Sequence, residues 1–159
     1  MKELVVALLL WISGMDTGYN LETISGRLDI IIVSENKLEE VCGEYCQKTS
    51  QLIKKNGGGK EKLHAVYSGT ERTIYISEGF DIDNKEDQGI LLHELMHHIQ
   101  FINKISGKKS NPKKIFECFY THESEATYYE TLWRHENGMN IREQLGMLVV
   151  YTRMCEGKA

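Results

Sequence analysis

The feature that most constrains this chain is a run of apolar residues interrupted by a few ionisable ones. Within residues 89–100 (GILLHELMHHIQ), His93 and His97 are four positions apart and Glu94 directly follows the first histidine. On an α-helix, residues four apart are separated by about 40° around the axis and about 6 Å along it. Both imidazole rings therefore leave the same face of the helix. The apolar residues around them predict a helix that is buried almost all round.

This H-E-x-x-H pattern predicts a zinc site. Neutral imidazole suits zinc, and two histidines at this spacing can bind one ion together. We therefore predict His93 and His97 as metal ligands for Zn²⁺, with Glu94 as the catalytic general base and acid acting on a zinc-activated water. His98 projects about 100° away from His97, and we interpret it as a supporting or structural residue. The alternative is a pair of core histidines without metal.

A catalytic zinc ion usually has three protein ligands, so a third is expected elsewhere in the chain. The metzincin extension of the motif requires Gly and His where this sequence has Gln100 and Asn103, which excludes that class. Glu123 and Glu125 differ by about 200° around a helix, so only one of them can face the metal. The candidates all lie on the next predicted helix: Glu117, His122, Glu123, Glu125 and Glu130.

An H-E-x-x-H motif followed by a helix carrying E-S-E-A resembles the gluzincin clan of metallopeptidases in a minimal, one-domain form. More narrowly, it resembles small uncharacterised zincin-like domains of exported bacterial proteins. The similarity covers roughly Cys42 to Trp133. In the E-x-x-A-D form of the clan, the third ligand stands three positions before the alanine, which is Glu123 here. In the thermolysin-like N-E-A form it directly precedes the alanine, which is Glu125.

The resemblance favours Glu123 as the third ligand and leaves Glu125 as the alternative. The family pattern has an aspartate after the alanine, which contacts a ligand histidine from behind. This chain has Thr127 at that position. The same contact is therefore expected from Glu130 or from another carboxylate.

The function that the resemblance implies is that of a zinc metallopeptidase, a hydrolase acting on a peptide or protein substrate. The substrate would run beside an exposed edge strand, for which we predict Thr73–Ser77. The alternative is a zincin-like module that binds zinc without proteolytic turnover, as a toxin, inhibitor or sensor. The presence of Glu94 favours the enzyme. A metal-free structural domain is the third alternative.

The remaining patterns predict a single α+β domain. Its expected form is a zincin-like fold, with a small antiparallel sheet of about three strands packed on the H-E-x-x-H helix and two further C-terminal helices. Runs rich in β-branched residues predict strands, and Gly69–Arg72 predicts a hairpin loop between two of them. The predicted strands are Arg27–Val33, Leu63–Ser68 and Thr73–Ser77, and the predicted helices are Glu35–Lys55, Gln88–Ile105, Ile115–Glu136 and Ile141–Cys155.

The N-terminus has a short charged start, nine consecutive apolar residues at Leu4–Ile12, and then small and polar residues. This outline predicts that residues 1–18 are a signal peptide or an N-terminal hydrophobic segment, followed by one domain over residues 19–159. The predicted location is secreted or periplasmic. Nine residues rise only about 14 Å as a helix, so no stable membrane span is expected.

The net charge and the cysteine content indicate which partners and which disulfides to expect. The net charge is −4, from 19 basic and 23 acidic residues, which argues against a nucleic-acid partner. In an exported domain the cysteines would form two disulfides, with three pairings open. A bridge between neighbours four apart would need a helix end or a turn, because their Cβ atoms lie about 6 Å apart in a regular helix. The four cysteines are Cys42, Cys46, Cys118 and Cys155.

Overall fold

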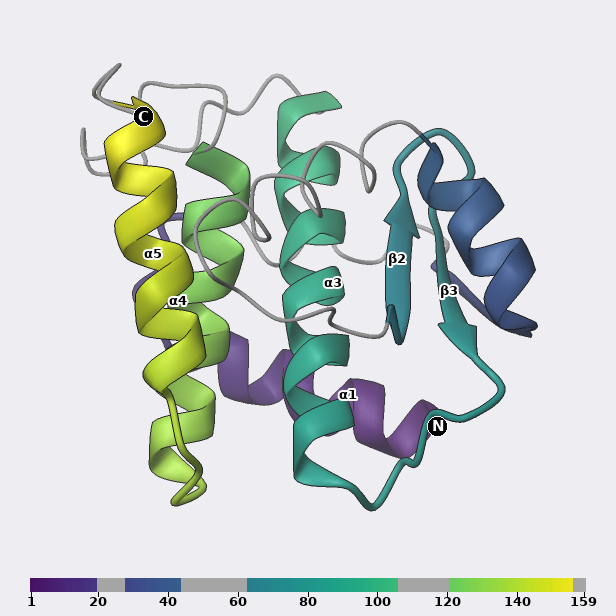
Figure 1. Ribbon diagram of the computed structural model, residues 1–159, viewed down its shortest axis with the longest axis horizontal. Coiled ribbons are helices and arrows are strands. Elements are labelled where there is room, and N and C mark those ends of the chain that lie inside the picture. Colours follow the sequence, from purple (N-terminus) through teal and green to yellow (C-terminus); the bar gives the residue numbers. More distant parts are fainter. Residues whose placement is uncertain (20–27, 44–62, 106–120, 156–159) are drawn as a thin grey trace.

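The computed structural model describes residues 1–19, 28–43, 63–105 and 121–155 (Figure 1). A further helical segment at residues 35–43 follows the first strand. The elements are α1 (Lys2–Ser13), β1 (Asp29–Val33), β2 (Ala65–Ser68), β3 (Thr73–Ser77), α3 (Lys85–Ile105), α4 (Thr121–Glu136) and α5 (Arg142–Cys155). The mixture of helices and a small sheet confirms the α+β class.

The three strands form one sheet in the order β1-β3-β2. The predicted hairpin is confirmed: β2 and β3 are antiparallel, with Ala65 opposite Ile76. The prediction of an antiparallel sheet is wrong for β1, which pairs with β3 in parallel. The physical reason is the connection after β1. A parallel pair needs a long crossover, and residues 34–72, which include the helix at 35–43 and β2, supply that length.

This strand order also corrects the predicted edge strand. Thr73–Ser77 is β3, the central strand, with β1 on one side and β2 on the other. The burial pattern agrees, since four of its five residues are buried. Among the described strands, the edges are β1 and β2, and it is β2 that packs against α3.

The helices form a layer beside the sheet (Figure 1). From the sheet outwards the order is α3, α4 and α5, and α1 crosses behind the lower part of α3 and α4. The two C-terminal helices of the prediction are therefore present. The core lies between the sheet and α3, and its innermost side chains, each at most 1% exposed, include Ile74, Ile76, Leu91, Leu92, Leu95, Met96 and Ile99.

Local signals in the sequence set the ends of the helices. Asn84 caps the start of α3, since its Oδ1 accepts a hydrogen bond from the Glu86 N–H at 2.7 Å. The helix α4 ends at Glu136, and Gly138 just after it has a left-handed φ of 71°. The Met139 N–H then donates to the Arg134 carbonyl at 3.0 Å, which closes the last turn.

Residues 1–19, called the N-terminal segment below, are part of the packed structure. Leu8 and Ile12 of α1 are 3% and 0% exposed and belong to the core. At the far end of α4, the Trp11 indole N–H donates to Glu136 at 2.8 Å. Within the described ranges, no helix has the length and apolar character that crossing a membrane requires. Removal of residues 1–18 as a signal peptide stays a prediction.

Cys42 is buried and disulfide-bonded. The side chains of Cys46, Cys118 and Cys155 lie outside the described residues, so the pairing predicted from the cysteine count stays open.

The packing of α1 gives a direct stability prediction. Ile12→Ala removes a fully buried side chain and should lower the free energy of unfolding by about 2–5 kcal/mol. Leu10→Ala, on the same helix but 66% exposed, should change it by less than about 0.5 kcal/mol. Urea unfolding of both variants of the full chain measures the difference. Equal effects in the two variants would show that α1 contributes nothing to the core.

Candidate metal centre

Three predicted ligands meet between α3 and α4. The Nε2 atoms of His93 and His97 lie 3.1 Å apart. Oε1 of Glu123 lies 3.1 Å from the His97 Nε2, and its Oε2 lies 3.5 Å from the His93 Nε2. Among the described residues, these three form the one group of His, Cys, Asp or Glu side chains with the spacing of metal ligands, all within 4.8 Å of one another. We refer to it as the His–His–Glu cluster.

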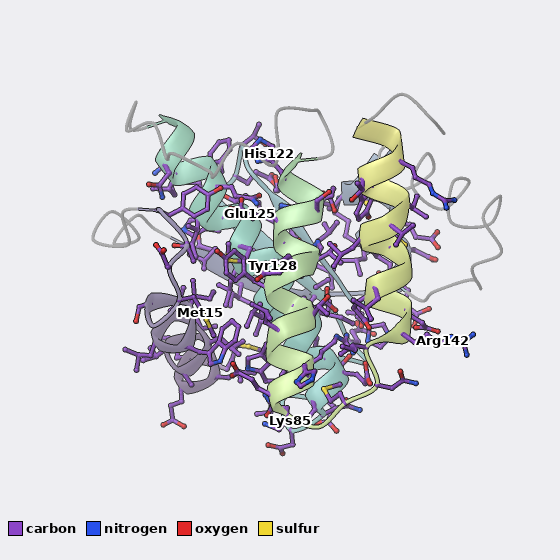
Figure 2. All side chains as sticks on the ribbon, turned by 90° about the vertical axis from the view of Figure 1, so that its left-hand side faces the viewer. Met15, Lys85, His122, Glu125, Tyr128 and Arg142 are labelled. Atoms are coloured by element: carbon purple, nitrogen blue, oxygen red, sulfur yellow. The ribbon has the colours of Figure 1, made fainter. Side chains whose placement is uncertain are left out.

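The two glutamates left open as third ligand point to different neighbours. Glu123 lies against the histidines, while the Glu125 carboxylate accepts hydrogen bonds from Gln100 Nε2, at 2.9 Å, and from the Tyr19 hydroxyl. Glu125 is labelled in Figure 2, on α4 below His122. Both glutamates are on the same helix, and their angular separation decides which one reaches the histidines. The geometry therefore places Glu123, and not Glu125, with the two rings.

His93 is held from behind by a buried carboxylate. Its Nδ1–H donates to Oε2 of Glu130 at 3.1 Å. The other oxygen of Glu130 accepts from Nε of Arg134 at 2.7 Å, and Arg134 also forms an ion pair with Glu86. With the proton on Nδ1, the Nε2 lone pair of His93 faces the cluster. The contact that was expected from Glu130 is therefore present, on His93.

His97 is held by an amide instead. Its Nδ1 lies 2.9 Å from Oε1 of Gln100. The amide orientation follows from the network, because Gln100 Nε2 faces two acceptors, the His122 carbonyl at 3.0 Å and Glu125 Oε2 at 2.9 Å. The Gln100 oxygen must then face His97 and accept its Nδ1–H. The Nε2 lone pair of His97 is consequently directed into the cluster as well.

Glu94 lies beside the cluster and is anchored by the sheet. Its side chain is buried, and the backbone N–H of Tyr67 on β2 donates to Oε2 at 2.7 Å. Burial raises the pKa of Glu94 above its ordinary value, although the charges of His97 and His93 limit the rise. A carboxyl group with a raised pKa can accept and return a proton more readily near neutral pH, as a general base and acid must.

Charge within the cluster is balanced by its own members. Burial lowers the pKa of His93, but hydrogen bonds and charges from Glu123 and Glu130 more than reverse this, and the pKa lies well above the usual value. Burial raises the pKa of Glu123, yet His97 and His93 bring it well below the usual range. Two imidazole nitrogens whose lone pairs face each other repel unless a proton or a cation lies between them. The donor set of two histidines and one glutamate is one that zinc takes in hydrolases.

His98 has a structural position. It is fully buried, and its Nδ1 lies 3.0 Å from the Tyr67 hydroxyl. Burial and then the charge of Arg72 lower the pKa of His98 to about 4, so the ring is neutral at pH 7. His98 therefore packs toward β2 and takes no part in the cluster.

Among the described ligand candidates, His122 is not in the cluster: its side chain is exposed and its carbonyl binds Gln100. Glu117 lies outside the described residues. Of the partners that support the ligands, the sequence predicted Glu130 but not Gln100, Arg134, Tyr19 or Tyr67. Arg134, four positions after Glu130, had a helical signal for pairing. Tyr19 and Tyr67 are distant in sequence from what they bind, and no local pattern indicated them.

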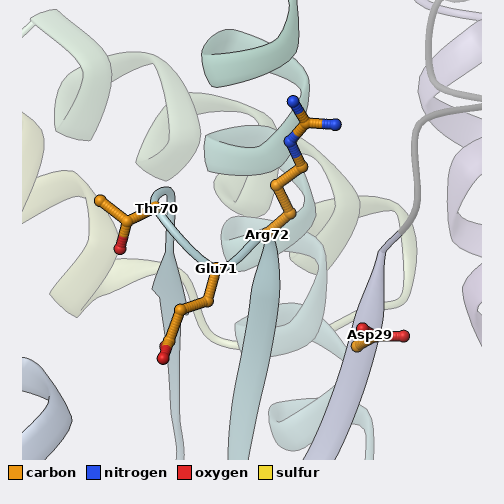
Figure 3. Close-up of a pocket in the computed structure, with 4 residues that line it drawn as sticks. All are labelled: Asp29, Thr70, Glu71 and Arg72. Atoms are coloured by element: carbon orange, nitrogen blue, oxygen red, sulfur yellow. The ribbon is translucent and has the colours of Figure 1, made fainter.

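A separate hollow lies at the turn between β2 and β3, as Figure 3 shows. It is lined by Asp29, Thr70, Glu71 and Arg72. Arg72 has a left-handed φ of 54° and its carbonyl accepts the Asp29 N–H at 3.2 Å, which ties β1 to the turn. Glu71 accepts from the Tyr75 hydroxyl at 2.7 Å. This hollow shares no residue with the His–His–Glu cluster.

The arrangement behind His93 predicts opposite effects for two helical glycines. A Cβ on Gly89 would lie 3.0 Å from Nε of Arg134, whose guanidinium is fixed by Glu130 and Glu86. A Cβ on Gly146 of α5 would meet nothing within 4 Å. Gly146→Ala should raise the free energy of unfolding by about 1 kcal/mol through helix propensity.

Gly89→Ala should lower it instead, because an overpacking cost of about 1–3 kcal/mol outweighs that gain. Urea unfolding of the two variants checks the sign of each. If both variants were stabilised alike, Gly89 would not be needed for the approach of Arg134.

Comparison with curated proteins and with solved structures gives no match. Residues 1–158 match a protein family that is described as a domain of unknown function, DUF6647. The match includes the N-terminal segment, the sheet and every member of the His–His–Glu cluster. The chain therefore belongs to the DUF6647 family.

Proposed function

We propose that this protein is a zinc-dependent metallopeptidase that hydrolyses peptide bonds. The observation that carries the proposal is the convergence of His93, His97 and Glu123, with Nε2–Nε2 and Nε2–Oε1 distances of 3.1 Å, next to the buried carboxyl group of Glu94. The donor set fits zinc, and the Nδ1 atom of each ring has a partner that leaves Nε2 available.

The chemistry divides between the ion and the chain. Zinc bound by His93, His97 and Glu123 would polarise a carbonyl group and lower the pKa of a water molecule. Glu94 takes the proton of the attacking water and returns it to the leaving amine. The Tyr67 N–H holds one oxygen of Glu94, so the carboxyl group stays in one orientation during the transfer.

An extended peptide would bind along the outer edge of β2, which among the described strands pairs only with β3. This strand replaces the predicted Thr73–Ser77, which is central in the sheet. β2 packs against α3, and the Tyr67 N–H of β2 binds Glu94. The edge of β2 is therefore held next to the proposed general base. Main-chain hydrogen bonds to an edge strand bind substrates with little dependence on side-chain identity.

The proposed location is an oxidising, extracytoplasmic compartment. The disulfide at Cys42 supports it, since disulfides persist in such compartments. Residues 1–18 were predicted to be either a signal peptide or an N-terminal hydrophobic segment. The burial of Leu8 and Ile12 supports the second alternative, a segment that remains part of the fold.

Elemental analysis of zinc tests the ligand set. The wild-type protein should hold about one zinc ion per chain, and Glu123→Gln should lose it, because one of the three ligands is removed. Glu125→Gln, the comparison variant on the same helix, should still hold about one zinc ion per chain at saturating metal, although with weaker affinity because Glu125 supports Gln100. A wild-type protein that binds no zinc after incubation with excess metal would overturn the proposal. Loss of zinc in Glu125→Gln alone would assign the third ligand to Glu125.

Glu94→Gln separates catalysis from binding. The amide keeps the shape of the side chain and an oxygen for the Tyr67 N–H, but it cannot accept the proton of the attacking water. The variant should bind zinc as the wild type does and cleave a casein substrate about 10²–10⁴-fold more slowly. Equal turnover by both proteins would exclude Glu94 as general base. Zinc binding without cleavage by the wild type would support the alternative, a zincin-like module without turnover.

A further inference from the structure

A chain of polar contacts runs from the N-terminal segment to the His–His–Glu cluster. The Tyr19 hydroxyl donates to Oε2 of Glu125. The same oxygen accepts from Gln100 Nε2 at 2.9 Å, and the Gln100 oxygen accepts the His97 Nδ1–H at 2.9 Å. Glu125 and Gln100 are 6% and 5% exposed, so water is largely excluded from these contacts.

We call these contacts, from Tyr19 through Glu125 and Gln100 to His97, the relay. Each contact in the relay fixes the orientation of the next side chain. Gln100 can orient His97 only while its NH₂ group faces acceptors and its oxygen faces the ring. A reversed amide would present NH₂ to the Nδ1–H of His97, which is a clash of donors. The Glu125 carboxylate and the His122 carbonyl together oppose that reversal, and the Tyr19 hydroxyl fixes the position of the carboxylate. The proton on Nδ1 of His97, and hence the lone pair on Nε2, depends on all three side chains.

The backbone conformation after α1 places Tyr19 next to Glu125. After α1 the chain turns through Gly18, whose φ of 72° is left-handed. The hydroxyl of Thr17, a buried residue, accepts the Tyr19 N–H at 3.3 Å. At the other end of α4, Trp11 binds Glu136. The N-terminal segment thus contacts α4 near both ends, and Figure 2 shows α1 with Met15 beside α4 on the side of Glu125.

We propose that Tyr19 is a positioning residue of the metal centre, which orients His97 through Glu125 and Gln100. The proposal rests on the function proposed above only in that the cluster binds zinc. Under this proposal the N-terminal segment supports the residues that bind the metal ion. Removal of the Tyr19 hydroxyl should therefore weaken metal binding although Tyr19 does not touch the metal ligands.

The test compares two tyrosines in the full-length protein. Tyr19→Phe removes the hydroxyl that binds Glu125. Tyr128→Phe makes the same chemical change on α4, at a side chain that is 46% exposed. The Kd for Zn²⁺ is measured by competition with a chromophoric chelator, and the absorption spectrum of the Co²⁺-loaded protein reports ligand geometry. Tyr19→Phe should weaken zinc binding about 10-fold, the lower end of the range for groups that support metal ligands. Tyr128→Phe should leave the Kd unchanged.

A double-mutant cycle with Gln100→Ala identifies the route. If Tyr19 acts through Gln100, Tyr19→Phe should have no further effect on the Kd in the Gln100→Ala background. Trp11→Phe removes a second hydrogen bond between the N-terminal segment and α4, the one to Glu136, and it should leave the Kd and the Co²⁺ spectrum unchanged. Thermal unfolding of the metal-free variants shows whether each is folded at the temperature of the titration.

The outcomes separate this proposal from the proposed function. Zinc binding by the wild type with an unchanged Kd in Tyr19→Phe would overturn the role of Tyr19 and leave the metallopeptidase intact. Equal weakening by Trp11→Phe, or additive effects of Tyr19→Phe and Gln100→Ala, would overturn the relay in favour of general docking. A wild-type protein that binds no zinc would overturn both proposals.

Discussion

Two imidazole rings and a carboxylate lie close together between α3 and α4. This arrangement depends on the hydrogen bonds made by the ring nitrogens that face away from the cluster. A half-buried histidine turns its Nε2 inward only if a partner fixes the proton on Nδ1. Here the partners are Glu130 for one ring and Gln100 for the other. Each partner is itself bound, Glu130 by Arg134 and Gln100 by Glu125. The support reaches outward through α3, α4 and the N-terminal segment, and these contacts tie the elements together as well as orienting the rings.

Helix geometry gives three glutamates of α4 three different roles. Glu123 and Glu130 are seven positions apart, so they lie on nearly the same face of the helix, and both reach His93, one from each side of the ring. Glu125 is displaced by about 200° from Glu123 and faces Gln100 and Tyr19. Ala126 is fully buried, and its small side chain allows α3 and α4 to lie close enough for these contacts.

The residues of the candidate site that could be predicted from the sequence are those whose spacing follows the period of a helix. The pair His93 and His97 and the neighbouring Glu94 follow from angles around one axis, as does the rule that only one of Glu123 and Glu125 can face the histidines. The choice of Glu123 came from the family resemblance. Strand pairing has no such local rule. The parallel alignment of β1 with β3 depends on a crossover of many residues, and the partners of Tyr19 and Trp11 are set by how four helices pack. Those contacts become visible only when the elements are placed in space.

The separation of these partners along the chain bears on how the protein is made. Trp11 and Glu136 are 125 residues apart, and Tyr19 and Glu125 are 106 apart. The hydrogen bonds between the N-terminal segment and α4 therefore cannot form until α4 has been synthesised. Contacts between residues so distant in sequence form slowly, and apolar surface that stays uncovered during that time is exposed to aggregation. The contact of Tyr19 that completes the surroundings of His97 is thus one that depends on a long stretch of chain between its two partners.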